Sequence, residues 1–329
     1  MLFLEILVVL RIEHYLCIRV SVNKMYQKTI YEAVKISGIG LHTGLSSEVK
    51  ILPSLANTGI IFKRIDLTKN NIVKASCHNV PSARLCTTLE NSFGVKVSTV
   101  EHLLAALYIK GIDNALIEIN NEEVPIMDGS AKNFLDILQD VKIKVLSQKR
   151  NFLKVTEKIE LVEDEKRISL EPNDDTLEVE FQLNYQNKVI GKQKNTVNFE
   201  RDNLDDISKS RTFCLYKDIE KIKKAGLAKG GSLENAVVVD DEKVLNNGGL
   251  RNDKEFVNHK ILDLVGDFML SGYRVLGKVK CSQGGHELTN RFLKKLLNSQ
   301  VINLYQNPEN IAVSEKFNTQ SSSKIAISA

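Results

Sequence analysis

The chain has 329 residues, of which 43% are hydrophobic and 26% are charged, and its formal net charge is +4. This length is ample for a packed core and favours two domains over one. The absence of Trp and the low aromatic content argue against a base-stacking nucleic-acid module, and so small a net charge does not by itself indicate a nucleic-acid partner.

The N-terminal segment 1–24 starts with an apolar stretch that is interrupted only by Glu5 within its first ten residues. This stretch is too short to span a bilayer, and it lacks the positive region and the cleavage site of a signal peptide. We interpret 1–24 as an extension outside the fold, with Met25 as the usual start; a membrane-associating segment is the alternative. No transmembrane segment is expected.

Between residues 25 and 306 the same order of elements is predicted twice. Each half is expected to contain a pair of strands, a helix with polar candidate residues, a further strand and an amphipathic helix. These elements are 34–53, 103–110, 114–120 and 131–141 in the first half and 153–172, 253–271, 274–281 and 287–298 in the second.

The predicted fold is therefore α+β, with two similar two-layer sandwich domains built from a duplicated β-α-β-α unit and with the active site at their interface. The first domain is assigned to 25–148 and the second to 149–306, because the polar segment 147–151 separates the two patterns. Segment 307–329, rich in Ser, Asn and Gln, is predicted to be a disordered tail.

An insert at about 215–250 interrupts the second half. It contains a lysine-rich helical stretch, a short run of β-branched residues and a glycine-rich turn. Two interpretations remain open for this insert, a solvated segment with a basic face and a lid or channel wall for a bulky substrate.

The helix predicted over 253–271 contains the firmest functional signal. His259 and Asp263 are four residues apart, so both side chains can reach one metal ion from the same face. Asp267 extends this polar face by another turn, whereas the apolar residues form a separate stripe. Asn252 with Glu255 matches a capping box at the start of this helix.

Glu101 and His102 stand at the start of the mostly apolar helix of the first half. The helix dipole disfavours an imidazolium in the first turn, so His102 is expected to stay neutral, the form that binds a metal. Two histidines and Asp263 supply the three protein ligands of a catalytic zinc site, which leaves one position for water. Glu101 is either a base or only a cap, because Ser98-x-x-Glu101 also matches a capping box.

Five segments of the chain, in order and with matching spacing, resemble UDP-3-O-acyl-N-acetylglucosamine deacetylase. The resemblance extends from about residue 28 to residue 299. The five segments are STVEHLLAAL from Ser98, VPIMDGS from Val124, SRTF from Ser210, HKILDLVGD from His259 and GGH from Gly284.

The resemblance implies zinc-dependent hydrolysis of the N-acetyl group of UDP-3-O-(3-hydroxyacyl)-N-acetylglucosamine to acetate and a free amine, the committed step of lipid A biosynthesis. It implies that one zinc ion is held by His102, His259 and Asp263. It also implies that Glu101 is the base that takes a proton from water.

Further roles follow from the same resemblance. His286 matches the family's acid, which protonates the leaving nitrogen, and Asp267 is placed to hydrogen-bond that imidazole and raise its pKa. Thr212 matches a residue that stabilises the oxyanion. Phe213 and Lys260 match substrate contacts, although a solvent-exposed lysine would fit the position of Lys260 equally well.

Several alternatives remain open at this stage. Zinc is favoured over Fe2+ by the ligand set, but metal availability decides which ion occupies such a site. Two alternatives to the deacetylase remain. One is a metal-dependent hydrolase of the same fold that acts on another amide, and the other is a non-catalytic protein that binds a sugar nucleotide or an acyl chain. The non-catalytic alternative is disfavoured by the presence of all five candidate catalytic and metal-binding residues, Glu101, His102, His259, Asp263 and His286.

The expected cellular setting follows from the cysteines. The chain has five cysteines and no CxxC pair, so neither a complete disulfide framework nor a thiolate zinc site is indicated. We expect a cytoplasmic monomer whose contact with a membrane surface is made through the acylated substrate, and no nucleic-acid partner.

Overall fold

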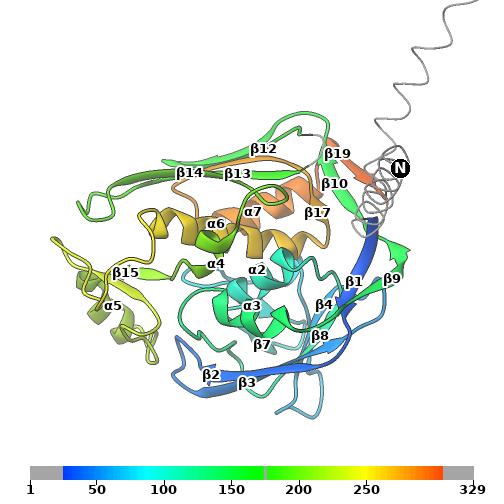
Figure 1. Cartoon of the computed structure of the whole chain (residues 1–329), viewed down its shortest axis with the longest axis horizontal. Helices are drawn as coiled ribbons and strands as arrows, with labels where there is room; N and C mark the ends of the chain where they lie inside the picture. Colours follow the sequence, from blue (N-terminus) through cyan, green and yellow to red (C-terminus); the bar gives the residue numbers. More distant parts are fainter. Residues whose placement is uncertain (1–24, 174–175, 307–329) are drawn as a thin grey trace, which may run out of the picture.

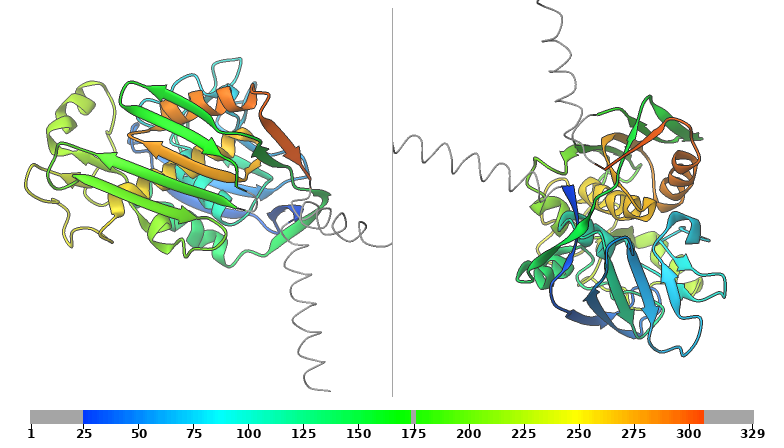
Figure 2. Two further views of the ribbon diagram at one scale, coloured as in Figure 1. Left: turned by 90° about the horizontal axis from the view of Figure 1, so that it is seen from above. Right: turned by 90° about the vertical axis from the view of Figure 1, so that its right-hand side faces the viewer.

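The computed structural model describes residues 25–173 and 176–306, so the predictions for 1–24 and 307–329 lie outside the described residues. Two mixed five-stranded sheets form the outer layers, and helices fill the space between them (Figure 1). Figure 2 shows the same layers from two further directions. The α+β class is confirmed. None of the helices within the described ranges combines the length and apolar character needed to cross a lipid bilayer.

The first sheet has the strand order β2-β3-β8-β4-β5, and β4 and β8 are its only parallel neighbours. Buried and less buried side chains alternate along its strands, because one face packs against the helices α2 and α3. These elements are β2 Val34–Ile39, β3 Ser46–Pro53, β4 Ile60–Arg64, β5 Ile72–Lys74, α2 Glu101–Ile109, β8 Ala115–Ile119 and α3 Lys132–Gln139.

The second sheet repeats this connectivity with the order β11-β12-β18-β13-β14, in which β13 and β18 are the only parallel neighbours. Helices α6 and α7 cover its inner face (Figure 1). These elements are β11 Ile159–Glu163, β12 Lys166–Glu171, β13 Leu177–Asn184, β14 Lys192–Asn198, α4 Asp205–Lys209, α6 Glu255–Phe268, β18 Gly277–Ser282 and α7 His286–Leu297.

Smaller elements connect and extend these layers. Three pairs, β1 with β9, β6 with β7 and β15 with β16, and the triplet β17-β10-β19 form separate small sheets. The insert, which starts at the end of β15 and contains α5 and β16, projects from one end of the molecule (Figure 1). The bounds are β1 Tyr26–Ile30, η1 Cys77–Asn79, β6 Leu89–Glu90, β7 Lys96–Val97, β9 Ile143–Lys149, β10 Phe152–Val155, β15 Phe213–Leu215, η2 Tyr216–Asp218, α5 Ile219–Lys224, β16 Val237–Val239, η3 Met269–Ser271, β17 Arg274–Val275 and β19 Ile302–Tyr305.

The structure corrects the sequence prediction in two places. The polar segment 147–151 is not wholly a linker, because its first three residues end β9, which pairs with β1. The strand pair predicted over 153–172 is three strands, because β10 joins a separate sheet and only β11 and β12 form the hairpin. By contrast, the helix predicted over 253–271 is confirmed as α6 followed by η3, and it ends at Gly272, whose φ of 78° is left-handed.

Asp113 links the two halves through a largely buried group of charges. Its carboxylate accepts hydrogen bonds from Nε and Nη2 of Arg150 at 2.9 and 2.7 Å, and from Nε of Arg274 at 3.3 Å. The Arg274 guanidinium also stacks 4.1 Å from the ring centroid of Tyr108. Burial and the neighbouring Arg274 lower the pKa of Arg150, and the Asp113 carboxylate opposes this shift.

We expect Asp113→Ala to lower the free energy of unfolding by about 3 kcal/mol, because two largely buried cations lose a shared anion. Asp136→Ala is the matched control, since Asp136 makes an exposed pair with Lys132 and its loss should cost less than about 0.5 kcal/mol. Urea unfolding of the two variants measures the difference. Equal stabilities would contradict the linking role of Asp113.

Candidate active site

Helices α2 and α6 cross with their backbones in contact at Gly266. A Cβ atom at this position would overlap the carbonyl oxygen of Glu101 and would lie 3.2 Å from the backbone nitrogen of Ala105. Glycine is therefore required for this close approach. The first turn of α2 is held against the middle of α6, and His102 consequently faces His259 and Asp263.

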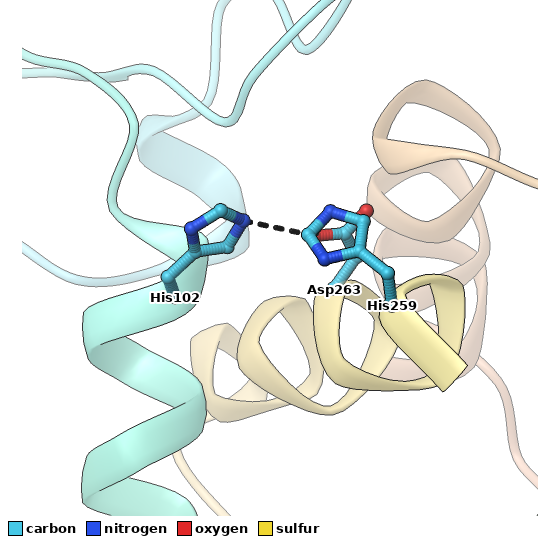
Figure 3. A group of neighbouring side chains, drawn as sticks. All are labelled: His102, His259 and Asp263. Carbon is cyan, nitrogen blue, oxygen red and sulfur yellow. Dashed lines mark ion pairs between the residues drawn. The ribbon is translucent and has the colours of Figure 1, made fainter. Parts of the chain in front are cut away.

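The three predicted metal ligands converge, as Figure 3 shows, from one helix of each half. Asp263 Oδ1 lies 3.4 Å from His102 Nε2 and 3.3 Å from His259 Nε2. The potential ligand atoms all lie within 4.8 Å of one another, and all three residues are buried. The imidazole rings meet edge to face, with centroids 5.0 Å apart.

The hydrogen bonding of these side chains suits a bound cation. His259 Nδ1 lies 3.1 Å from the Ser210 carbonyl oxygen, which only accepts, so Nδ1 carries the proton and the Nε2 lone pair faces the cluster. Burial lowers the pKa of His259 to about 3, which keeps the ring neutral. Asp263 Oδ1 is buried and has no hydrogen-bond partner among the described residues. Two nitrogens and one carboxylate oxygen fit the ligand set of a catalytic zinc ion.

Asp263 is ionised despite its burial. Burial opposes the charge, but the ammonium group of Lys260 and the protonated imidazole of His286 hold the pKa of Asp263 well below its usual range. Lys260 Nζ lies 2.6 Å from Asp263 Oδ2, so this oxygen has a partner and Oδ1 does not. Lys260 is thus placed inside the site, and the alternative of a freely exposed lysine is wrong.

His286 and Glu101 lie close to Asp263, with His286 Nε2 3.7 Å from Asp263 Oδ2. His286 Nδ1 lies 2.8 Å from Asp267 Oδ2, and its Nε2 lies 3.8 Å from Glu101 Oε1. Although burial opposes the charge, the carboxylates of Asp267, Asp263 and Glu101 raise the pKa of His286 to about 9. Burial also raises the pKa of Glu101, against the effect of the neighbouring histidines. The pair therefore offers a proton donor beside a basic carboxylate.

Glu101 does not cap α2. The Glu101 carboxylate accepts the Thr87 backbone N–H at 3.0 Å, and no side chain caps the helix at Val100. The hydroxyl group of Ser98 donates to the carbonyl oxygen of Glu122 at 3.2 Å. The capping-box interpretation of this segment is wrong, because both side chains have partners elsewhere in the fold.

The capping box at the start of α6 is also wrong. Glu255 is fully buried and accepts Nε of Arg211 at 2.7 Å and the backbone N–H of Arg211 at 3.0 Å. Asn252 instead accepts the backbone N–H of Lys254 at 3.1 Å. Glu255 thereby fixes the segment that places the Ser210 carbonyl against His259.

The predicted site residues surround one polar cavity of about 250 Å³. All of them line it except Asp267, which is reached through His286. The Thr212 backbone donates to the carbonyl oxygen of Gly129 at 2.7 Å, and the Phe213 ring lies 6.3 Å from the His259 ring, centroid to centroid. The structure thus places these residues around the same cavity.

A second, more apolar cavity of about 460 Å³ adjoins the first. Thr212 and Phe213 line both cavities, and Ile219 and Ile222 of α5 line only the second. The insert therefore forms part of the apolar wall of this cavity. This observation favours a channel wall over a purely solvated segment.

Comparison with known proteins identifies the family. The family profile described as UDP-3-O-acyl N-acetylglycosamine deacetylase (LpxC) matches residues 27–298. The chain belongs to this family. UDP-3-O-acyl-N-acetylglucosamine deacetylase of Pseudoalteromonas translucida (strain TAC 125) is 41% identical over 274 residues, covering 82% of this chain and 90% of the relative. That of Geotalea uraniireducens (strain Rf4) is 43% identical over 273 residues, covering 83% and 88%.

Membership places the protein among the metal-dependent deacetylases of lipid A biosynthesis, as the sequence motifs indicated. The buried cluster of His102, His259 and Asp263 agrees with the zinc dependence of the LpxC family, since it is a candidate metal site. The fold agrees as well, with its two mixed five-stranded sheets and the helices between them.

Sequence reasoning missed Thr87, which contacts two site carboxylates at once. Its hydroxyl group donates to Asp267 Oδ1 at 2.6 Å, and its backbone N–H donates to Glu101 Oε2 at 3.0 Å. Thr87 is 1% exposed. No motif includes it, and only the tertiary structure brings it within reach of α6.

We expect Gly266→Ala to weaken metal binding by about tenfold or more, because the added Cβ forces α2 away from α6 and separates His102 from Asp263. Gly231→Ala makes the same chemical change in the insert, away from the cluster, and should leave metal affinity unchanged. Titration of metal-free protein with zinc measures both affinities. Tight, stoichiometric binding by Gly266→Ala would contradict the close-approach argument.

We expect Thr87→Val to lower kcat of the deacetylase about 10- to 100-fold at unchanged KM, because Asp267 loses a charge-assisted hydrogen bond and its imidazole partner shifts. Thr87→Ser retains the hydroxyl group and should recover most of the loss. Thr88→Val, the same change at the next residue, should have little effect. Equal kinetics for the two valine variants would refute the positioning role of Thr87.

Proposed function

We propose that this chain hydrolyses the N-acetyl group of UDP-3-O-(3-hydroxyacyl)-N-acetylglucosamine and releases acetate and the free amine. The main support is the His-His-Asp cluster in a polar cavity that adjoins an apolar one. The polar cavity suits an amide with its sugar, and the apolar cavity suits an acyl chain. Family membership supplies the reaction class.

We propose that one zinc ion is held by His102, His259 and Asp263. When bound, zinc polarises the amide carbonyl and makes water more acidic. The unpartnered Asp263 Oδ1 and the inward lone pair of His259 support this assignment. Zinc is favoured over Fe2+ by the two imidazoles and the carboxylate, and metal availability in the cell decides between them.

Glu101 is the proposed base, which accepts a proton from the attacking water. Glu101 is 3% exposed, and its carboxylate is oriented by the Thr87 backbone N–H. Burial raises its pKa, and a higher pKa makes a carboxylate a stronger base.

His286 is the proposed acid. Expulsion of an amine anion is prohibitive, so the nitrogen must receive a proton as the C–N bond breaks. Asp267 holds Nδ1 of His286 and leaves its Nε2 facing the cavity, while the raised pKa keeps the ring protonated at neutral pH. We assign oxyanion stabilisation to the hydroxyl group of Thr212, whose backbone is fixed on both sides by hydrogen bonds.

Lys260 and Phe213 are the proposed substrate contacts. Lys260 presents an ammonium group to the polar cavity, where it can meet an anionic or carbonyl oxygen of the UDP-sugar. Phe213 lies at the boundary of the two cavities, where the sugar would pass into its acyl chain. The acyl chain is assigned to the apolar cavity walled by the insert.

We further propose that the chain is a duplicated pair of two-layer domains, 25–148 and 149–306, with the site where the halves meet. The matching strand orders of the two sheets support this division. A cytoplasmic monomer that meets the membrane surface through its acylated substrate is consistent with the free thiols of Cys77, Cys86, Cys214 and Cys281.

The test is acetate release from the UDP-sugar, with metal analysis of the same sample. Glu101→Gln and His286→Gln should each lower kcat by about 100-fold or more, and Glu101→Gln should retain its metal. Chelation should abolish turnover, and added zinc should restore it. His78→Gln, at an exposed histidine outside the cavity, is the control and should be fully active.

Two outcomes would overturn the proposal. Turnover that survives exhaustive chelation would exclude a metal-dependent hydrolase. Tight binding of the UDP-sugar without acetate release by the metal-loaded wild-type protein would favour the non-catalytic binding protein.

A further inference from the structure

Glu123 is a fully buried carboxylate that only uncharged groups compensate. It is 0% exposed, and its hydrogen-bond partners within the described ranges are backbone N–H and hydroxyl groups. Its Oε1 accepts the His42 backbone N–H at 2.8 Å and the Thr99 hydroxyl at 2.9 Å. Its Oε2 accepts the backbone N–H and the hydroxyl of Thr43, both at 2.7 Å. Burying a charge is costly, so these four donors must be held firmly in place.

Two of the donor residues belong to the loop between β2 and β3, which walls the apolar cavity. Leu41 and His42 line this cavity. Their backbone carbonyl oxygens accept Gly230 N–H at 3.0 Å and Lys229 N–H at 3.3 Å from the insert. A side chain at Gly230 would overlap the carbonyl oxygen of Gly40, so the two loops lie in direct contact. Glu123 therefore anchors the loop on which the insert rests.

The remaining donor lies at the entrance to α2. Thr99 has a left-handed backbone with φ of 57°, a strained conformation for a β-branched residue, and it precedes Glu101 by two positions. Its hydroxyl group is held by the same Glu123 oxygen that holds the loop at His42. One carboxylate thus connects the catalytic end of α2 to the wall of the apolar cavity.

We propose that Glu123 is a positioning residue that fixes the acyl-chain cavity relative to the catalytic centre and so determines how acyl-chain length affects turnover. This inference rests on the proposed function, in which the apolar cavity holds the acyl chain. A carboxylate offers acceptor sites on both oxygens to the four donors, whereas glutamine would turn an NH2 group towards two of them. Glutamine therefore fills the same space, but it loses the hydrogen bonds that one of the two carboxylate oxygens accepts.

The experiment compares acetate release from two UDP-3-O-acyl-N-acetylglucosamines, one with a long 3-hydroxyacyl chain and one with a short chain. For Glu123→Gln we expect kcat/KM to fall about tenfold with the long chain, mainly through KM, and less than about threefold with the short chain. Metal content should not change. Glu122→Gln makes the same change at the adjacent exposed residue and should match the wild-type protein.

The outcomes separate this inference from the proposed function. No acetate release by the wild-type protein from either substrate would refute the proposed function itself. Acetate release by the wild-type protein, with equal losses for both chains or no loss in Glu123→Gln, would refute only the role of Glu123. Thr43→Val is a second, milder variant in case Glu123→Gln does not fold. It removes only the hydroxyl group that donates to Glu123 from the loop. It should reduce kcat/KM selectively for the long chain, and an equal effect on both chains would also refute the inference.

Discussion

The backbone contact between α2 and α6 is the constraint on which the site depends. His102 comes from the first half of the chain, and His259 and Asp263 come from the second, so no local element can form the cluster. Only a glycine at position 266 permits the first turn of α2 to touch α6. The spacing of the ligands is therefore determined by backbone packing, which is stiffer than side-chain packing and suits a site that needs fixed geometry.

Within that geometry, the partner of the ring Nδ1 distinguishes His259 from His286. His259 Nδ1 meets a backbone carbonyl, and burial lowers the pKa of the ring to about 3. His286 Nδ1 meets the carboxylate of Asp267, and its pKa rises to about 9. Two buried imidazoles thus differ in charge at neutral pH. His259 is suited to bind a cation, and His286 is suited to give up a proton. The difference arises from the group that each Nδ1 contacts, a backbone carbonyl for His259 and a carboxylate for His286.

The sequence was informative where a pattern is local. Spacing along one helix placed His259, Asp263 and Asp267 on a common face, and hydrophobic periodicity located most helices and strands. Prediction from the sequence failed where a side chain has partners that are distant along the chain. Glu101 and Glu255 matched capping boxes, yet both carboxylates bind residues of other segments. Thr87 and Glu123 had no signal, since their importance arises only from tertiary hydrogen bonds. Strand β9 was missed because its polar residues resemble a linker.

The segment Ser210 to Phe213 connects the His-His-Asp cluster to the apolar cavity. The Ser210 carbonyl orients His259, Glu255 binds Arg211, and Thr212 and Phe213 line both cavities. The backbone of Thr212 also bonds to Gly129 of the first half and to Val237 of the insert. A shift of the insert would therefore reach His259 through four consecutive residues. Variation in the wall of the apolar cavity is easiest at positions on α5, which line only that cavity, and most costly within this segment.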